Sequence, residues 1–322
     1  MRAKRLITIV LTVFIVLLPV LGFWQRLAIF DLFRLHGYQP PVSVSQLATD
    51  TTMEESTRRL FYVYHPAIED KSKFNDACRG NEQTIVLGCY VSGLGIYLLD
   101  VSDSRLNGVE QVTAAHETLH AAYARLSSSE RKKINAMTAT AFSSLTDQRV
   151  KDTIELYRKQ DASVIPNELH SILGTEVRNL PEDLETYYRQ YFKDRSQVVG
   201  YSEQYEQAFT DRKNQILAFD TQLSALKEQI DQLQVLLERS ATSLSQEREK
   251  LDSERSSGNL NAYNDGVGPY NSHVVSYNRQ VDQLSALVAQ YNDIVPKRNA
   301  VALEEQDLVQ AIDSRRTVPA RQ

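Results

Sequence analysis

The segment His116-Glu117-Thr118-Leu119-His120 carries the residue types best suited to metal chemistry. It matches the pattern H-E-x-x-H, in which two histidines are separated by four positions. On a helix these two imidazoles project from one face, one turn apart, so both can bind a single zinc ion. Glu117 then lies beside the metal, where it can take a proton from the attacking water. The sequence therefore predicts His116 and His120 as metal ligands and Glu117 as a catalytic base.

A catalytic zinc ion usually has three protein ligands and one open position. No third histidine follows His120 at the spacing found in metzincins, and the next dense group of suitable side chains spans Pro166 to Glu176. Within it, Asn167-Glu168 resembles the gluzincins, the thermolysin-like clan of zinc peptidases, whose third ligand is a glutamate often preceded by Asn on a second helix. The resemblance implies Glu168 as the third ligand, one catalytic Zn²⁺, and a peptide or protein as substrate.

The match to this clan has one departure and leaves two roles open. The acidic residue often found four positions after the ligand glutamate is Ile172 here, so the second-shell partner of the first histidine is unassigned. Glu176 is either a rival third ligand or that missing partner. His170 is expected to donate to the oxyanion of the transition state, as the resemblance implies, or to be a polar surface residue. Zinc suits two histidines and a glutamate, although ligand type alone does not exclude cobalt or manganese.

Residues 37–199 are predicted to form the α+β zincin-like domain that positions these groups. Two segments rich in β-branched and aromatic residues, 59–64 and 95–101, are predicted strands. The resemblance implies that residues 96–101 form a sheet edge that aligns an extended substrate, and the alternative is an internal strand. These strands precede the segment that carries the H-E-x-x-H motif.

The helices of this domain are predicted from their boundary residues. A helix follows Asn107-Gly108 and continues through Leu126, so it contains the motif. Ser127-Ser128-Ser129-Glu130 forms a capping box that begins the next helix. Pro166 and Pro181 are placed where further helices begin, because proline is well tolerated in a first helical turn.

The N-terminus predicts a membrane anchor. Residues 6–24 form an uncharged apolar run of the length that a helix needs to cross a bilayer. Basic residues at positions 2, 4 and 5 would hold the N-terminus in the cytoplasm, which makes the chain a single-pass protein whose bulk is extracytoplasmic. The alternative is a cleaved signal peptide. The predicted segments are a transmembrane signal-anchor over residues 1–24, with the lipid bilayer as partner, and a juxtamembrane stretch over residues 25–36.

The two cysteines are expected to form a disulfide. Cys78 and Cys89 lie eleven positions apart around a turn-prone stretch. The environment outside the cytoplasm is oxidising enough for a disulfide between them to form. The alternative is a pair of free, buried thiols. The pair lacks the C-x-x-C spacing of a zinc site.

Residues 200–322 are predicted to form an antiparallel coiled-coil hairpin. Apolar residues recur at alternating steps of three and four in two segments; they are Phe209, Ile216, Phe219, Leu223, Leu226, Ile230, Leu233 and Leu237, and then Val274, Tyr277, Val281, Leu284, Val288, Tyr291 and Val295. Residues 256–269 are predicted as the break between the two arms, and Pro296 is expected to kink or end the second arm. The hairpin either stands alone or pairs with a coiled-coil partner or a second copy.

The composition narrows the possible functions. The 322 residues are 42% hydrophobic and 24% charged, with a net charge of −5, which is typical of a folded protein. A mildly acidic chain lacks the basic surface that nucleic-acid binding requires. The sequence therefore predicts a membrane-anchored, extracytoplasmic zinc metallopeptidase. The alternative is a non-catalytic envelope scaffold or interaction protein that acts through its coiled coil.

Overall fold

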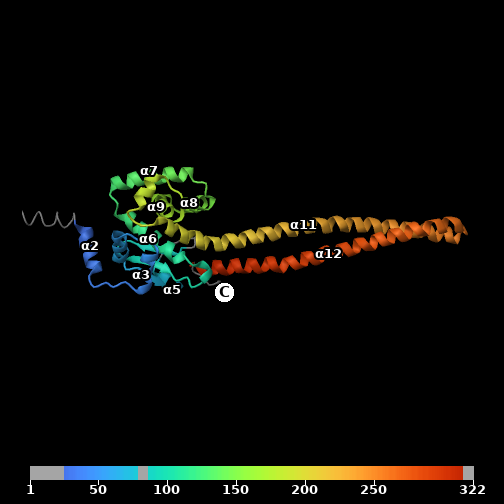
Figure 1. Ribbon diagram of the computed structural model, residues 1–322, viewed down its shortest axis with the longest axis horizontal. Helices are drawn as coiled ribbons and strands as arrows, with labels where there is room; N and C mark the ends of the chain where they lie inside the picture. Colours follow the sequence, from blue (N-terminus) through green and yellow to red (C-terminus); the bar gives the residue numbers. More distant parts are fainter. Residues whose placement is uncertain (1–24, 79–85, 315–322) are drawn as a thin grey trace, which may run out of the picture. The chain divides into compact units, whose positions relative to one another are not determined.

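The computed structural model describes residues 25–78 and 86–314, and helices make up most of them (Figure 1). The elements in chain order are α2 (Arg26–Leu35), α3 (Val42–Asp50), α4 (Glu55–Val63), β1 (Ala67–Glu69), α5 (Lys71–Ala77), β2 (Gly88–Val91), β3 (Gly95–Leu99), α6 (Val109–Arg125), α7 (Ser128–Ser144), α8 (Gln148–Gln160), α9 (Ile165–Glu176), α10 (Glu182–Tyr188), α11 (Arg195–Ser256) and α12 (Leu260–Ile312). The predicted α+β class is therefore wrong, because the described chain is mostly helical and its sheet is small.

These elements divide between two compact units. Unit 1 contains the described residues up to Ala208 together with those from Leu308 onward, and unit 2 is Phe209–Asp307. Helix α6 has packing partners throughout unit 1, which are α3, α4, α9, β2 and β3. The helix that carries the H-E-x-x-H motif is therefore a central element of its unit.

The sheet of unit 1 has three strands in the order β1-β3-β2. Strand β3 is parallel to β1 and antiparallel to β2, with Cys89 opposite Tyr97. The predicted strand at residues 95–101 is thus present, but it lies between two others, so the prediction that it forms the sheet edge is wrong. In the described part of the chain, β2 is the edge strand beside α6.

The other predicted strand, residues 59–64, is not a strand: residues 59–63 belong to α4 and Tyr64 is its C-cap. Its Phe61 and the preceding Thr57 are four residues apart and both are buried, which is the spacing of one helix face. A segment of β-branched and aromatic residues adopts whichever state buries it, because β-propensity depends strongly on context.

The boundaries predicted for the helices around the motif are confirmed. Gly108 begins α6 with φ of +103°, a conformation that favours glycine. The capping box at the start of α7 is formed, since Ser127 and Glu130 each bond to the backbone of the other. Pro166 lies in the first turn of α9, where its missing N–H costs no hydrogen bond.

The predicted disulfide is confirmed. Cys78, which follows α5, is bonded to Cys89 of β2. The bridge ties the edge strand to a helix that packs against the other two strands of the sheet. Cross-linking positions eleven residues apart lowers the entropy of the unfolded chain, which is worth about 2–4 kcal/mol.

The predicted membrane localisation is corrected. No helix among residues 25–78 and 86–314 is both long enough and apolar enough to cross a bilayer. The structure thus gives no support for a single-pass membrane protein. The predicted span itself, residues 6–24, lies outside the described residues.

Unit 2 consists of the long parts of α11 and α12, which run antiparallel (Figure 1). The seam predicted on the first arm is present: Leu233 and Leu237 are buried and its other apolar members are partly buried. The second arm differs from the prediction. Helix α12 begins at Leu260 and continues through Pro269 and Pro296, so the break between arms is short.

The second arm also changes its register. Val281 and Val288, predicted as seam residues, are exposed, while Leu287 and Ile294 are partly buried. The shift occurs at Gln280, which faces Ser240 and accepts a hydrogen bond from its hydroxyl at 3.3 Å. A polar pair inside an apolar seam specifies which turns of the two helices are opposite.

Further polar pairs cross between the arms of unit 2. Arg298 donates to Asp220 at 2.9 Å, and Arg212 lies 3.4 Å from Glu304. His273 lies 2.8 Å from Glu247. These pairs oppose any sliding of one arm along the other, because a slip would separate several charged groups at once.

Helices α6 and α9 approach closely at Gly174. A Cβ atom at this position would lie 2.5 Å from Leu119 Cδ1 and 2.7 Å from Tyr188 Cε1, both closer than real Cβ contacts. The missing side chain thus lets α9 pack directly on the helix that carries the motif. The separation of α6 and α9 sets how near Glu168 comes to His116 and His120.

We predict that Gly174→Ala destabilises unit 1 by about 1–3 kcal/mol, because the added methyl group must push α9 away from α6 or displace Tyr188. The measurement is urea unfolding followed by circular dichroism. Gly200→Ala is the matched control, since only Arg178 lies near its Cβ, at 3.8 Å, and alanine favours a helix. Equal free energies of unfolding for the two variants would show that the close packing of α6 and α9 does not require glycine at position 174.

Candidate metal centre

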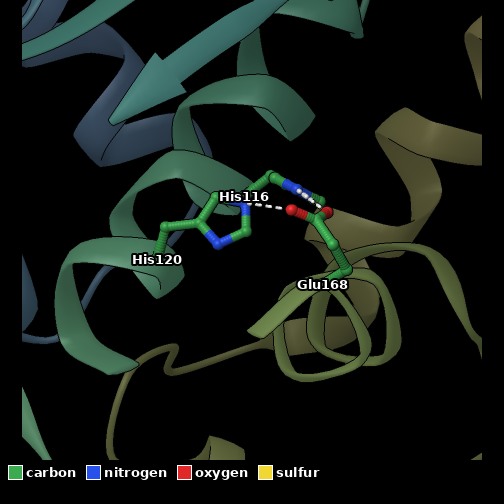
Figure 2. A group of neighbouring side chains, drawn as sticks. All are labelled: His116, His120 and Glu168. Carbon is green, nitrogen blue, oxygen red and sulfur yellow. Dashed lines mark ion pairs between the residues drawn. The ribbon is translucent and has the colours of Figure 1, made fainter. Parts of the chain in front are cut away.

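Three predicted ligands converge where α6 and α9 meet. The Glu168 carboxylate faces both histidine rings (Figure 2), with Oε2 3.7 Å from Nε2 of His116 and Oε1 3.6 Å from Nε2 of His120. One ligand atom from each residue lies within 4.8 Å of the other two. Two ligands of a tetrahedral zinc ion are about 3.4 Å apart, given bonds of about 2.0–2.1 Å. The three side chains therefore need only small movements to bind one ion.

The electrostatic state of Glu168 suits a metal ligand. Burial acts to raise its pKa, but His116 and His120, and to a smaller extent a hydrogen bond from Tyr157, outweigh this effect, so the pKa of Glu168 lies below its usual value. The carboxylate is thus ionised at neutral pH. Its Oε2 atom is buried and has no hydrogen-bond partner in the described chain. A buried anionic oxygen of this kind is expected to have a partner, and a cation between the histidines would supply one.

Each histidine also has a neighbour for its second ring nitrogen. Nδ1 of His120 lies 3.1 Å from the Ser171 hydroxyl, and Nδ1 of His116 lies 3.9 Å from Oε1 of Glu176. A metal-binding histidine usually donates its other N–H to an oxygen, which holds the ring in place. Glu176 thus lies on the Nδ1 side of His116, whereas the Glu168 carboxylate faces Nε2 of both histidines.

Glu117 lies under the edge strand β2. Its side chain is almost fully buried, and a Cβ atom at Gly88 would be 2.8 Å from Glu117 Cγ and 2.5 Å from Thr113 Cγ2. Only glycine at position 88 lets the strand approach α6 this closely. The predicted base is thus held between the motif helix and an edge strand.

Among the described residues, the backbone of β2 pairs on one side only, with β3. Leu87 and Cys89 direct their hydrogen-bonding groups toward β3, since Leu99 N–H donates to the Leu87 carbonyl and Cys89 is paired with Tyr97. In an antiparallel pair the intervening residues, Gly88 and Tyr90, direct theirs to the other side. No backbone hydrogen bond to that side is present in the described part of the chain.

His170 is not placed as the sequence suggests. Its side chain is fully buried, and its Nε2 lies 2.9 Å from the Tyr187 hydroxyl. The surrounding rings belong to Tyr123, Tyr187, Tyr188 and Tyr191. Burial, together with the charges of His120 and His116, lowers the pKa of His170 to about 3, so the ring is neutral. The structure therefore supports neither an oxyanion donor open to substrate nor a polar surface residue at this position.

Several residues near the centre were not predicted from the sequence. Ser171 could have been found, since it lies one helical turn after Glu168 on the same face. Tyr157, Arg149 and Glu206 have no spacing relation to the motif. Their positions follow from the packing of α8 and α11, which a local pattern does not report.

Comparison with protein-family models, with curated proteins and with solved structures finds no match for this chain. The chemical interpretation of the centre therefore depends on its own residues and their geometry.

We predict that Glu168→Gln weakens zinc binding more than Glu176→Gln does. Loss of a group that hydrogen bonds to a metal ligand typically costs about 10–100-fold in affinity, and loss of a direct ligand costs more. Zinc dissociation constants measured by competition with a chromophoric chelator test this order. Glu155→Gln on the exposed side of α8 is the control. A larger loss for Glu176→Gln would make Glu176 the third ligand.

Proposed function

We propose that this protein is a zinc-dependent peptidase whose single metal ion is held by His116, His120 and Glu168. The observation that carries the proposal is the convergence of these side chains, with Glu117 next to His116 on the same helix and β2, an edge strand of the described sheet, beside it. A bound zinc ion would supply a water molecule of lowered pKa and would polarise the carbonyl of the bond to be cleaved.

Glu117 is the proposed general base. It follows His116 directly, so its side chain projects from α6 beside the ligand face rather than within it. There it accepts a proton from the attacking water and passes it to the amine that leaves. Its burial under β2 limits contact with bulk water, which favours transfer of the proton to substrate.

The substrate proposed for this site is an extended peptide lying along β2. The N–H and C=O groups of Gly88 and Tyr90, which have no backbone hydrogen bond within residues 25–78 and 86–314, can pair with a peptide backbone, as in other cases where a strand is added to a sheet edge. Because Gly88 lies against Glu117, a peptide bound along this edge would pass close to the proposed base. This assignment replaces the one made for residues 96–101, which form an internal strand.

Tyr157 is the proposed donor to the oxyanion. Its hydroxyl hydrogen bonds to Glu168 and so lies next to the ligand group. A phenol at this position can stabilise the negative charge that develops on the carbonyl oxygen. The role predicted for His170 is thus transferred to a residue of α8.

The proposal is tested first with Glu117→Gln. We expect zinc content to stay near one ion per chain while hydrolysis of a fluorogenic peptide library falls by about 100-fold or more, because the general base is lost. Glu110→Gln is the matched control, since Glu110 lies on the same helix and its carboxylate bonds to the backbone of Val101 instead. Unchanged hydrolysis in Glu117→Gln would refute the mechanism.

A second prediction concerns Tyr157→Phe. Removal of the hydroxyl should lower kcat by about 100-fold while KM stays within a few-fold, because an oxyanion donor acts mainly in the transition state. Steady-state kinetics with the same peptides and a parallel zinc assay check the outcome. A change confined to KM would assign Tyr157 to substrate binding.

The alternative function is a non-catalytic scaffold that acts through the hairpin of unit 2. The polar pairs that set its register, such as Ser240 with Gln280, leave the outer faces of both arms available to a coiled-coil partner or a second copy. Purified protein that contains no zinc and takes up none would favour this function over the peptidase.

A further inference from the structure

A network of charged side chains extends from the second ring nitrogen of His116. Its Nδ1 lies 3.9 Å from Oε1 of Glu176, and the other oxygen of that carboxylate, Oε2, accepts a hydrogen bond from Nη1 of Arg149 at 2.7 Å. The same Nη1 atom lies 3.2 Å from Oε1 of Glu206. This network thus connects the proposed metal ligand on α6 with side chains of α9, α8 and the first turns of α11.

Arg149 holds the carboxylates of Glu176 and Glu206 in fixed positions. Arg149 lies between two carboxylates that belong to different helices, so neither Glu176 nor Glu206 can move without loss of an ion pair. The two carboxylates are largely buried, and the Tyr205 hydroxyl bonds to Glu206. Ion pairs in such partly buried positions are screened less than those on the surface.

A histidine that binds a metal through Nε2 must carry its proton on Nδ1. Which nitrogen holds the proton is set by the hydrogen bond made at the other nitrogen. A carboxylate fixed near Nδ1 of His116 favours the tautomer whose Nε2 lone pair faces Glu168. The residues that fix that carboxylate therefore influence the metal ligand without touching it.

We propose that Arg149 and Glu206 are positioning residues, which hold Glu176 in place and so fix the ring orientation and tautomer of His116. The inference rests on the proposed metal centre and extends it from two helices to four. It makes the affinity for zinc depend on where the first turns of α11 lie, although no residue of α11 is a ligand.

The test uses the full-length protein and two readouts. In metal-free protein labelled with ¹⁵N-histidine, long-range ¹H–¹⁵N spectra report the tautomer of His116, assigned by comparison with His116→Gln. We expect Arg149→Met to shift His116 from one tautomer toward a mixture and to raise the zinc dissociation constant about 10–100-fold. Glu206→Gln should act in the same direction to a smaller extent, and should add less than about twofold to Arg149→Met.

Two comparisons separate positioning from general damage to the fold. Arg149→Lys keeps the positive charge and should recover part of the zinc affinity. Arg178→Met and Glu203→Gln remove an exposed ion pair that also joins the first turns of α11 to the segment after α9, and they should leave both readouts unchanged. If Arg149→Met does not fold, the His116 tautomer and the zinc dissociation constant of Glu206→Gln test the proposal.

Unchanged tautomer and unchanged zinc affinity in Glu206→Gln and Arg149→Met would overturn the proposal. The proposal would also be overturned if Arg178→Met and Glu203→Gln lowered zinc affinity as much as Arg149→Met does. Neither readout depends on hydrolysis. A protein that binds zinc and responds to these substitutions, yet cleaves no peptide, would refute the proposed function and leave the positioning role standing.

Discussion

The candidate centre depends on the close contact of α6 with α9. Two of the three ligands come from one turn of α6, and their relative position is set by helix geometry alone. The third, Glu168, must be brought to them by packing, and Gly174 permits that packing because no Cβ fits between Leu119 and Tyr188. A methyl group is therefore enough to affect both the core and the metal centre.

The contact between α6 and α9 buries ionisable groups. Their charged and polar neighbours offset the free-energy cost of removing them from water. Glu168 stays ionised because histidines and Tyr157 surround it, although burial alone would raise its pKa. His170, two residues after Glu168, is kept neutral among tyrosines and so adds no positive charge near the cation site. The ion pairs of Arg149 are partly shielded from water, because the side chains of Glu176 and Glu206 are largely buried, and charges interact more strongly at lower polarity.

Local features of the fold could be predicted from the sequence, and long-range ones could not. The motif helix, the capping box at Ser127 and the first arm of the hairpin follow from spacings of a few residues. The helix over residues 59–63 and the internal place of β3 are decided by tertiary packing, which outweighs local propensity. In the site, Glu168 could be predicted by its resemblance to a known ligand pattern. Arg149 and Glu206 could not, since nothing near them in the chain signals a metal.

Unit 1 is discontinuous in the chain, since it is completed by residues from Leu308 onward. Leu308 is fully buried and Ile312 and Ser314 nearly so, while the Ser314 hydroxyl accepts a hydrogen bond from Val86 N–H just ahead of β2. All three ligands and the whole hairpin are synthesised before these closing residues. Unit 1 can thus be completed only after the hairpin has been translated, so a chain that terminates before Leu308 lacks part of unit 1.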